Sequence, residues 1–358
     1  MFKLVSITFL TLVTFLIGYL SINIYRKFIL TYRIFGKPKK RDFHKTPIPN
    51  SSGIVFLFIF IIAGCGIKSY MDVFDLFNII VGGTIVCING FWDDLKMINP
   101  YQKILYQLIA VTFIIYNNDL VVQNLHGFLG IEHIPYWLGF GFTTFIGVFM
   151  INAFNLIDGI DGLAATTAVI SFVAYAIIFW VLNYKGYFGI CVILIGIILS
   201  YLPYNFSEKR KVFMGDSGAL FIGYLLFVMA MLVVNNSEPV IDRLIDRTVL
   251  PIAPMVIFIF PMVDTFSVYT LRLYAGGSPF APDHYHTHHL VLAFTNSHFM
   301  TSLIINFVCL LLICLFSFLA FRVSALTFVS LFFIVFFGLV LFIYFFRSIY
   351  RKKIFSVK

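Results

Sequence analysis

Long apolar runs, each about the length of a membrane-spanning helix, alternate along the chain with short polar segments. The first run, Leu4 to Ile24, has about 21 residues and would span roughly 30 Å. It lacks a small-residue cleavage site, so it is interpreted as a retained helix and not as a signal peptide. Eleven helices are predicted in all, at about 4–24, 53–70, 73–92, 103–118, 135–155, 162–183, 186–204, 217–235, 249–271, 300–321 and 325–346.

Composition supports the same fold class. Hydrophobic residues make up 61% of the chain and charged residues 11%, whereas a soluble domain carries about 25% charged residues. The five cysteines lack zinc-site spacing and are interpreted as buried thiols. We therefore predict an all-α polytopic integral membrane protein, with one transmembrane domain over 1–346 and a basic cytoplasmic tail at 347–358.

Lysine and arginine residues predict the orientation of these helices. With the N-terminus outside, nineteen of the 25 basic residues fall in cytoplasmic segments and six fall outside. This bias follows the positive-inside rule and predicts an outer N-terminus and a cytoplasmic C-terminus. The basic excess is thus explained by topology and does not indicate nucleic-acid binding. The outer segment 117–134 alternates weakly, which predicts a short hairpin.

Four polar clusters lie where apolar runs begin or end, and the predicted topology places all of them on the cytoplasmic side. They are Asp93-Asp94, Asn152 to Asp161, Met214-Gly215-Asp216 and Asp283 to His289. Carboxylates, amides and imidazoles gathered at one face from distant helices are the groups that a metal-phosphate site requires. A bare lipid anchor would not need them.

The second cluster is the most specific of the four. In a helix, Asn152, Asn155 and Asp158 would share one face because they recur every three residues. Amide and carboxylate oxygens suit a hard cation, while Gly159 allows close approach by a ligand. A capped helix end is the plainer interpretation, but it does not explain so many polar side chains, Asp161 among them, beside Phe and Leu.

The two short acidic clusters each allow two interpretations. Asp93 and Asp94 could form a metal-binding or proton-accepting pair, or a solvated helix terminus. Asp216 or Ser217 could cap the following helix. Alternatively, Asp216 could bind Mg²⁺ beside a helix N-terminus, where the helix dipole also favours phosphate.

The fourth cluster combines Asp283 with His286, His288 and His289. A zinc site is conceivable, but the cytoplasmic cysteines and carboxylates for one are missing locally. Imidazoles that donate to a diphosphate or protonate a leaving group fit better. Asp264 lies within a predicted helix, where an acid is either functional or hydrogen-bonded to another helix.

Taken together and in this order, the four clusters resemble those of the bacterial polyprenyl-phosphate N-acetylhexosamine-1-phosphate transferases. The resemblance covers roughly 1–346 and is closest to the undecaprenyl-phosphate GlcNAc-1-phosphate transferase branch. It implies a multi-pass enzyme of the bacterial cytoplasmic membrane that starts a cell-surface glycan such as the O-antigen of lipopolysaccharide. Such an enzyme moves a sugar-1-phosphate from a UDP-N-acetylhexosamine to undecaprenyl phosphate at the cytoplasmic face, releasing UMP. Mg²⁺, or Mn²⁺ in its place, is the implied cofactor, and a homodimer is a family-level expectation.

The resemblance also implies roles for individual residues. Asp216 and Asn155 would hold Mg²⁺, and Asp93, Asp94 and Asp158 would be catalytic, with Asp93 or Asp94 as a base beside the lipid phosphate. The lysines of the substrate-binding set would contact the lipid phosphate. The loop that contains Gly159 and Asp161 would line the uridine and diphosphate pocket, and the histidines would contact the donor phosphates. The substrate-binding set is Lys45, Lys103, Asn152, Gly159, Asp161, Asp283, His286, His288 and His289.

The sequence departs from the family pattern at a few positions, and two other functions are considered as alternatives. Gly277 stands where the family has a basic residue, and the interrupted His286-Thr-His288-His289 differs from the three consecutive histidines of phospho-MurNAc-pentapeptide translocase. The sugar is open among GlcNAc, GalNAc, QuiNAc and FucNAc. An ion-coupled secondary transporter would place its acids near the bilayer midplane in repeated, broken helices. A membrane phosphatase would not need a uridine pocket.

Overall fold

The computed structural model describes residues 2–32, 48–235, 246–274, 276 and 286–355. Lys45 and Asp283 therefore lie outside the described residues. The helices are α1 (Phe2–Tyr32), α2 (Gly53–Ile67), α3 (Val73–Lys96), α4 (Pro100–Asn117), α5 (Tyr136–Leu156), α6 (Leu163–Val181), α7 (Lys185–Asn205), α8 (Gly215–Val234), α10 (Ile252–Ile257), α11 (Ile259–Tyr274), α12 (Thr287–Thr295), α13 (His298–Leu319) and α14 (Ala325–Phe355).

Each of the eleven predicted segments has a helical counterpart, which confirms the all-helical, polytopic fold class. Nine described helices are long and apolar enough to cross a membrane, and α10 with α11 adds a tenth if the pair is one broken span. The two parts of that pair are bent by 74°. Pro261 lies just after the break and has no N–H to donate to the carbonyl of Ile257, so a straight helix cannot continue there.

Two smaller features of the described residues bear on the predicted elements. The segment after α4 contains an isolated antiparallel bridge between Asn124 and His133, which confirms the predicted hairpin in its simplest form. The nine-residue helix α12 was not predicted. It lies inside the region expected to be a cytoplasmic loop and carries His288 and His289.

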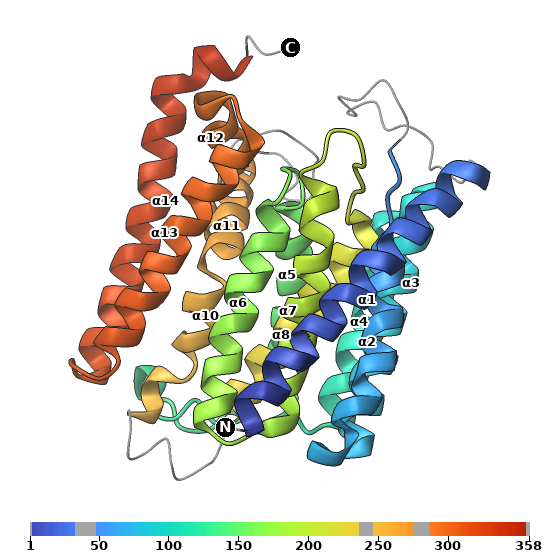
Figure 1. Cartoon of the computed structure of the whole chain (residues 1–358). Helices are drawn as coiled ribbons and strands as arrows, with labels where there is room; N and C mark the ends of the chain where they lie inside the picture. The colour runs from blue at the N-terminus through green and yellow to red at the C-terminus, as the bar shows by residue number, and fades with distance from the viewer. Residues whose placement is uncertain (1, 33–47, 236–245, 275, 277–285, 356–358) are drawn as a thin grey trace.

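Helix α8 forms the centre of the bundle. It packs against α2, α3, α5 and α6, and 94% of its membrane-spanning window is buried, against 28% for α13 and 33% for α14. Figure 1 shows α13 and α14 on one side of the molecule and α1 to α3 on the other, with α6 to α8 between them. An apolar composition alone does not place a membrane helix in the interior, because α13 and α14 are more apolar than α8 and are mostly exposed.

Two glycines let neighbouring helices approach the first turn of α8. A Cβ on Gly90 of α3 would lie 2.5 Å from the backbone carbonyl of Asp216. A Cβ on Gly53 of α2 would lie 2.1 Å from the backbone nitrogen of Gly218. Both distances are shorter than side chains tolerate, so the absence of side chains at these points fixes how close α2 and α3 come to Asp216.

Replacing Gly90 by Ala should therefore separate α3 from α8. We expect a loss of about 1–3 kcal/mol, the usual cost of overpacking a core, seen as a lower midpoint of thermal unfolding in detergent. Gly141 in α5 is the matched control, because a Cβ there meets nothing within 4 Å. Gly141→Ala should be neutral or stabilising, by up to about 1 kcal/mol. Equal unfolding midpoints for the two variants would contradict the close crossing.

Candidate active site

The carboxylate of Asp94 holds the first turn of α8. It accepts hydrogen bonds from the backbone N–H groups of Asp216 at 2.9 Å and Ser217 at 3.2 Å. Gly215, just before them, has a φ of +72° and approaches Asp94 more closely than a side chain would allow. The cap of α8 is thus supplied by a carboxylate from α3, and neither Asp216 nor Ser217 caps its own helix.

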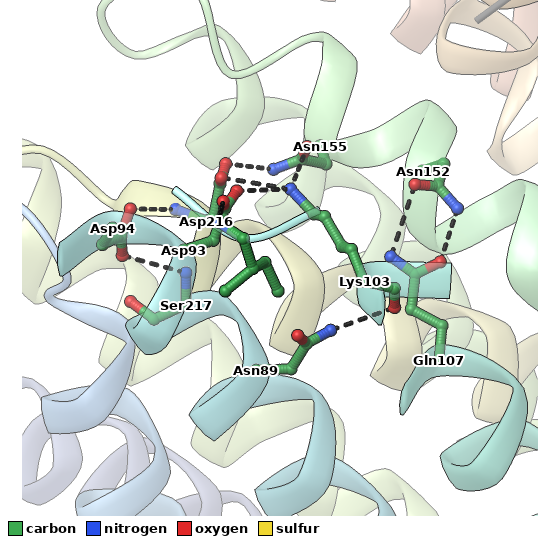
Figure 2. A network of polar contacts seen from close by, with 10 residues as sticks. Asn89, Asp93, Asp94, Lys103, Gln107, Asn152, Asn155, Asp216 and Ser217 are labelled. Carbon is green, nitrogen blue, oxygen red and sulfur yellow. Dashed lines mark hydrogen bonds and ion pairs between the residues drawn. The ribbon is translucent and has the colours of Figure 1, made fainter. Parts of the chain in front are cut away.

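Lys103 of α4 links three polar side chains from different helices. Its Nζ lies 3.1 Å from Oδ2 of Asp93 and 3.1 Å from Oδ2 of Asp216, and it donates to Oδ1 of Asn155 at 3.5 Å. Asn155 in turn donates from Nδ2 to Oδ1 of Asp216 at 2.9 Å. Figure 2 shows Lys103 reaching into the space between these groups. The predicted metal-binding pair, Asn155 and Asp216, is therefore in direct contact.

Further hydrogen bonds fix α4 beside its neighbours. Asp93 accepts from the backbone N–H of Ile98 at 2.9 Å, and Asn89 donates to the carbonyl of Lys103 at 3.1 Å. Asn152, predicted to bind substrate, exchanges hydrogen bonds with Gln107 at 2.6 and 3.3 Å (Figure 2). Gln107 was missed by the sequence reasoning because a lone glutamine in an apolar run has no motif around it.

Asp158 differs from these carboxylates because no described residue pairs with it. It lies half-buried in the loop between α5 and α6, and no hydrogen bond or ion pair of its carboxylate is found among the described residues. Burial raises the pKa of Asp158 well above its usual value, and the negative charges of Asp216, Asp94 and Asp161 raise it further. The site therefore contains an uncompensated acid beside Asp216.

Asp161, on the same loop, is fully paired. Its Oδ2 lies 2.6 Å from Nζ of Lys211 and 3.1 Å from Nδ1 of His298. Burial alone would raise the pKa of Asp161, but the hydrogen bonds from His298 and Lys211 hold it below its usual value. The backbone N–H of Gly162 also donates to Oδ1 of Asn205 at 2.6 Å. Sequence reasoning gave no role to Lys211, His298 or Asn205, each of which lies outside the recognised motifs.

The histidine cluster adjoins this loop through Gly159. A Cβ on Gly159 would lie 3.2 Å from Nε2 of His288 and 3.7 Å from Cε1 of His289, so a glycine leaves room for both rings. A carboxylate distant in the sequence, that of Asp264 in α11, contacts His286 and His288. All four clusters are thus represented at one end of the bundle.

The charges of the site favour a cation. Five carboxylates converge here, while Lys103 and Lys211 are the lysines that pair with them; the carboxylates are those of Asp93, Asp94, Asp158, Asp161 and Asp216. Oxygen ligands from carboxylates and an amide suit Mg²⁺, which usually takes one or two protein carboxylates together with substrate phosphates. Asp216 and Asn155, with Asp158 near them, have the chemistry to hold such an ion.

The fold and the site define a polytopic helical protein with an acidic, lysine-bridged cluster at one end of its bundle. Comparison with known proteins narrows the class. The model of glycosyl transferase family 4 matches residues 76–234, which carry three of the four clusters. The chain is 30% identical over 270 residues to a probable undecaprenyl-phosphate N-acetylglucosaminyl 1-phosphate transferase of Bacillus subtilis, covering 75% of this chain and 72% of the relative.

Two further relatives indicate the same family. The undecaprenyl-phosphate alpha-N-acetylglucosaminyl 1-phosphate transferase of Salmonella typhi is 29% identical over 78% of this chain and 74% of its own length. The decaprenyl-phosphate N-acetylglucosaminephosphotransferase of Mycobacterium leprae is 28% identical over 73% and 70%. The chain therefore belongs to glycosyl transferase family 4, among the polyprenyl-phosphate N-acetylhexosamine-1-phosphate transferases, which confirms the family predicted from its motifs.

Asp158 and Asp161 should respond to pH with opposite signs. The raised pKa of Asp158 means that its contribution to stability is present below the ordinary Asp pKa of about 3.9 and is lost as the pH rises through the raised pKa. Asp158→Asn should therefore stabilise the protein in EDTA at pH 7, and this gain should shrink as the solution is acidified. Thermal unfolding in detergent from about pH 4 to 8 measures it.

Asp161→Asn is the matched control for that measurement. The lowered pKa of Asp161 contributes stability above the ordinary Asp pKa that is lost as the pH falls through the lowered value. This variant should therefore be less stable than the wild type at pH 7, with a smaller difference at acid pH. The same sign of change for both variants at pH 7 would contradict the charge assignment.

Proposed function

We propose that the protein transfers N-acetylhexosamine-1-phosphate, with GlcNAc-1-phosphate as the group moved, from a UDP-sugar to undecaprenyl phosphate with release of UMP. The reaction would be the first membrane step of a cell-surface glycan. The observation that carries the proposal is the meeting of Asp93, Asp216, Asn155 and Lys103 at the ends of separate membrane helices. The activities for which the relatives are named support the choice of sugar and lipid.

The charges of the substrates explain why such a site is needed. Both the lipid phosphate and the sugar nucleotide diphosphate are anions, so an oxygen of the first reaches the β-phosphorus of the second only if their repulsion is offset. Phosphoryl transfer is catalysed mainly by positioning and electrostatic stabilisation. A divalent cation held by Asp216 and Asn155 would supply Lewis-acid charge neutralisation when bound. Lys103 supplies a second positive charge from the protein itself.

The contacts of the carboxylates suggest how a proton would be handled. Asp94 accepts two backbone N–H groups of α8, which favours a supporting role for it. Asp93 has both carboxylate oxygens engaged, one with Ile98 and one with Lys103. No described residue engages the carboxylate of Asp158, and burial together with the nearby carboxylates raises its pKa, so it is the better proton acceptor of the three. We propose that Asp158 accepts the proton of a protonated lipid phosphate while an oxygen of that phosphate displaces UMP in a single step.

Asp216→Ala tests the proposal directly. Membranes containing the wild type, given UDP-GlcNAc, undecaprenyl phosphate and Mg²⁺, should produce UMP and a lipid-diphosphate-sugar in equal amounts. The variant should lose at least about 10²-fold in rate, because a principal electrostatic contact at the reacting phosphates is removed. Chromatography of UMP and of the lipid product measures both.

The control variant is Asp119→Asn, which changes an exposed acid beyond the far end of α4. Its rate should equal that of the wild type. A transporter would yield neither product, and a phosphatase would release inorganic phosphate from the lipid. Undiminished UMP release by Asp216→Ala would reject the assignment of Asp216, and the absence of a lipid-diphosphate-sugar from the wild type would reject the function.

We also propose that this site faces the cytoplasm, because the basic residues concentrate on its side of the predicted topology. Lys209 and Lys185 are both exposed, Lys209 in the segment before α8 and Lys185 at the opposite end of α7. In a background without the five native cysteines, a membrane-impermeant maleimide added to intact cells should label Lys185→Cys and not Lys209→Cys. Opening the cells should expose Lys209→Cys. The reverse pattern would invert the topology.

A further inference from the structure

A buried carboxylate outside the acidic site holds the histidine cluster. Asp264 of α11 has an exposed fraction of 0%. Its Oδ2 lies 3.0 Å from Nδ1 of His286 and 3.1 Å from Nδ1 of His288, and its Oδ1 accepts from the backbone N–H of Thr287. The two imidazoles are themselves buried, with exposed fractions of 4% and 1%. The carboxylate therefore has three donors around it.

These contacts decide the state of both rings. An ionised carboxylate only accepts hydrogen bonds, so Nδ1 of His286 and Nδ1 of His288 must each carry a proton. The Nε2 atom of a neutral ring is then left as an acceptor, and the Nε2 atom of a protonated ring is a donor. Because Asp264 brings one negative charge to two imidazoles, it can balance a single additional proton shared by the pair.

The position of His288 connects this buried group to the acidic site. Its Nε2 lies 3.2 Å from the place that a Cβ on Gly159 would occupy, beside the loop that carries Asp158. The ring centroids of His288 and His289 are 4.4 Å apart, so the two rings pack together at this loop. Nδ1 of His288 therefore faces Asp264, and Nε2 of the same ring lies beside the Gly159 loop.

We propose that Asp264 is a positioning residue that acts through His286 and His288. It fixes both Nδ1 atoms as donors and sets the orientation of both rings. The additional proton that Asp264 balances then lies on Nε2 of His288, which donates it in a hydrogen bond to a substrate phosphate bound at the Gly159 loop. This step rests on the proposed function for the identity of the substrate. The hydrogen-bonding assignment is independent of that function, because it follows from the contacts of Asp264 alone.

The rival interpretation of the same three side chains is a buried metal. Asp264, His286 and His288 each offer a ligand atom, and these atoms lie within 4.8 Å of one another. Hydrogen bonding fits better, because the N–H of Thr287 and both Nδ1 atoms already satisfy the carboxylate. Elemental analysis separates the two, since purified wild type that holds one zinc per chain, lost in Asp264→Asn, would overturn the proposal.

Asp264→Asn is the informative substitution, because an amide keeps the shape but offers both a donor and an acceptor. Its NH₂ group would face an imidazole Nδ1 and force that ring into the other tautomer. We expect kcat for UMP release to fall between about tenfold and 10⁴-fold, the range seen when an imidazole loses its orienting carboxylate. The KM for undecaprenyl phosphate should change little, since Asp264 contacts the histidine cluster, whereas the lipid phosphate is assigned to Lys103.

A double-mutant cycle distinguishes action through the histidines from a structural role. In a variant that already carries His286→Ala and His288→Ala, adding Asp264→Asn should lower kcat by less than about threefold. Full additivity would overturn the proposal. Thr265→Val is the matched control: Thr265 is buried next in sequence, and its hydroxyl has no hydrogen-bond partner among the described residues. It should keep wild-type kcat.

A measurement without substrate keeps this test separate from the proposed function. The chain has eight histidines, few enough for ¹⁵N-histidine labelling and solid-state NMR in membranes. The Nδ1–H signals that disappear in His286→Ala and in His288→Ala identify the two rings. These two signals should be present in the wild type and in Thr265→Val and altered in Asp264→Asn. Their presence in a wild type that releases no UMP would support the positioning and reject the function. Unchanged signals in Asp264→Asn would overturn the positioning itself.

Discussion

The contact on which the site depends is the carboxylate of Asp94 against the N-terminus of α8. A helix N-terminus has unpaired N–H groups and a partial positive charge, and a buried carboxylate satisfies both. Such a cap typically contributes about 0.5–2 kcal/mol. Its greater effect here is geometrical, because it fixes the backbone of Asp216 against α3, where Gly90 permits the close approach. Asp216 then has a defined direction towards Lys103 and Asn155.

The second constraint is the surplus of acidic groups among the described residues of the site. In this part of the chain Lys103 is shared between Asp93 and Asp216, Lys211 pairs with Asp161, and no basic residue pairs with Asp158. A partly buried carboxylate without a partner destabilises a folded protein. The divalent cation of the proposed function would relieve this imbalance on binding, and the same surplus of acidic groups would strengthen its binding.

The sequence predicted the helices and the grouping of the clusters because both follow from the lengths of apolar runs, which the bilayer dictates. The partners of the site residues were not predictable in this way. Lys103 and Asp216 are 113 positions apart, and no local pattern encodes their contact. Lys211 was indistinguishable from a topology signal, and His298 stood alone at the start of a helix. For Asp264 the sequence indicated a buried acid, but not that its partners were the histidines downstream.

In each half of the site a buried carboxylate orients the neighbouring groups by accepting their hydrogen bonds. Asp94 orients the acidic half through backbone N–H groups of α8, and Asp264 orients the histidine half through imidazole Nδ1 atoms. Each carboxylate is buried on a different helix, and the two halves meet at Gly159. A reaction between two anions tolerates little error in where its charges lie, since misplacement by about 1 Å can cost 10²-fold in rate. Placing both supports on helices inside the bundle meets that requirement.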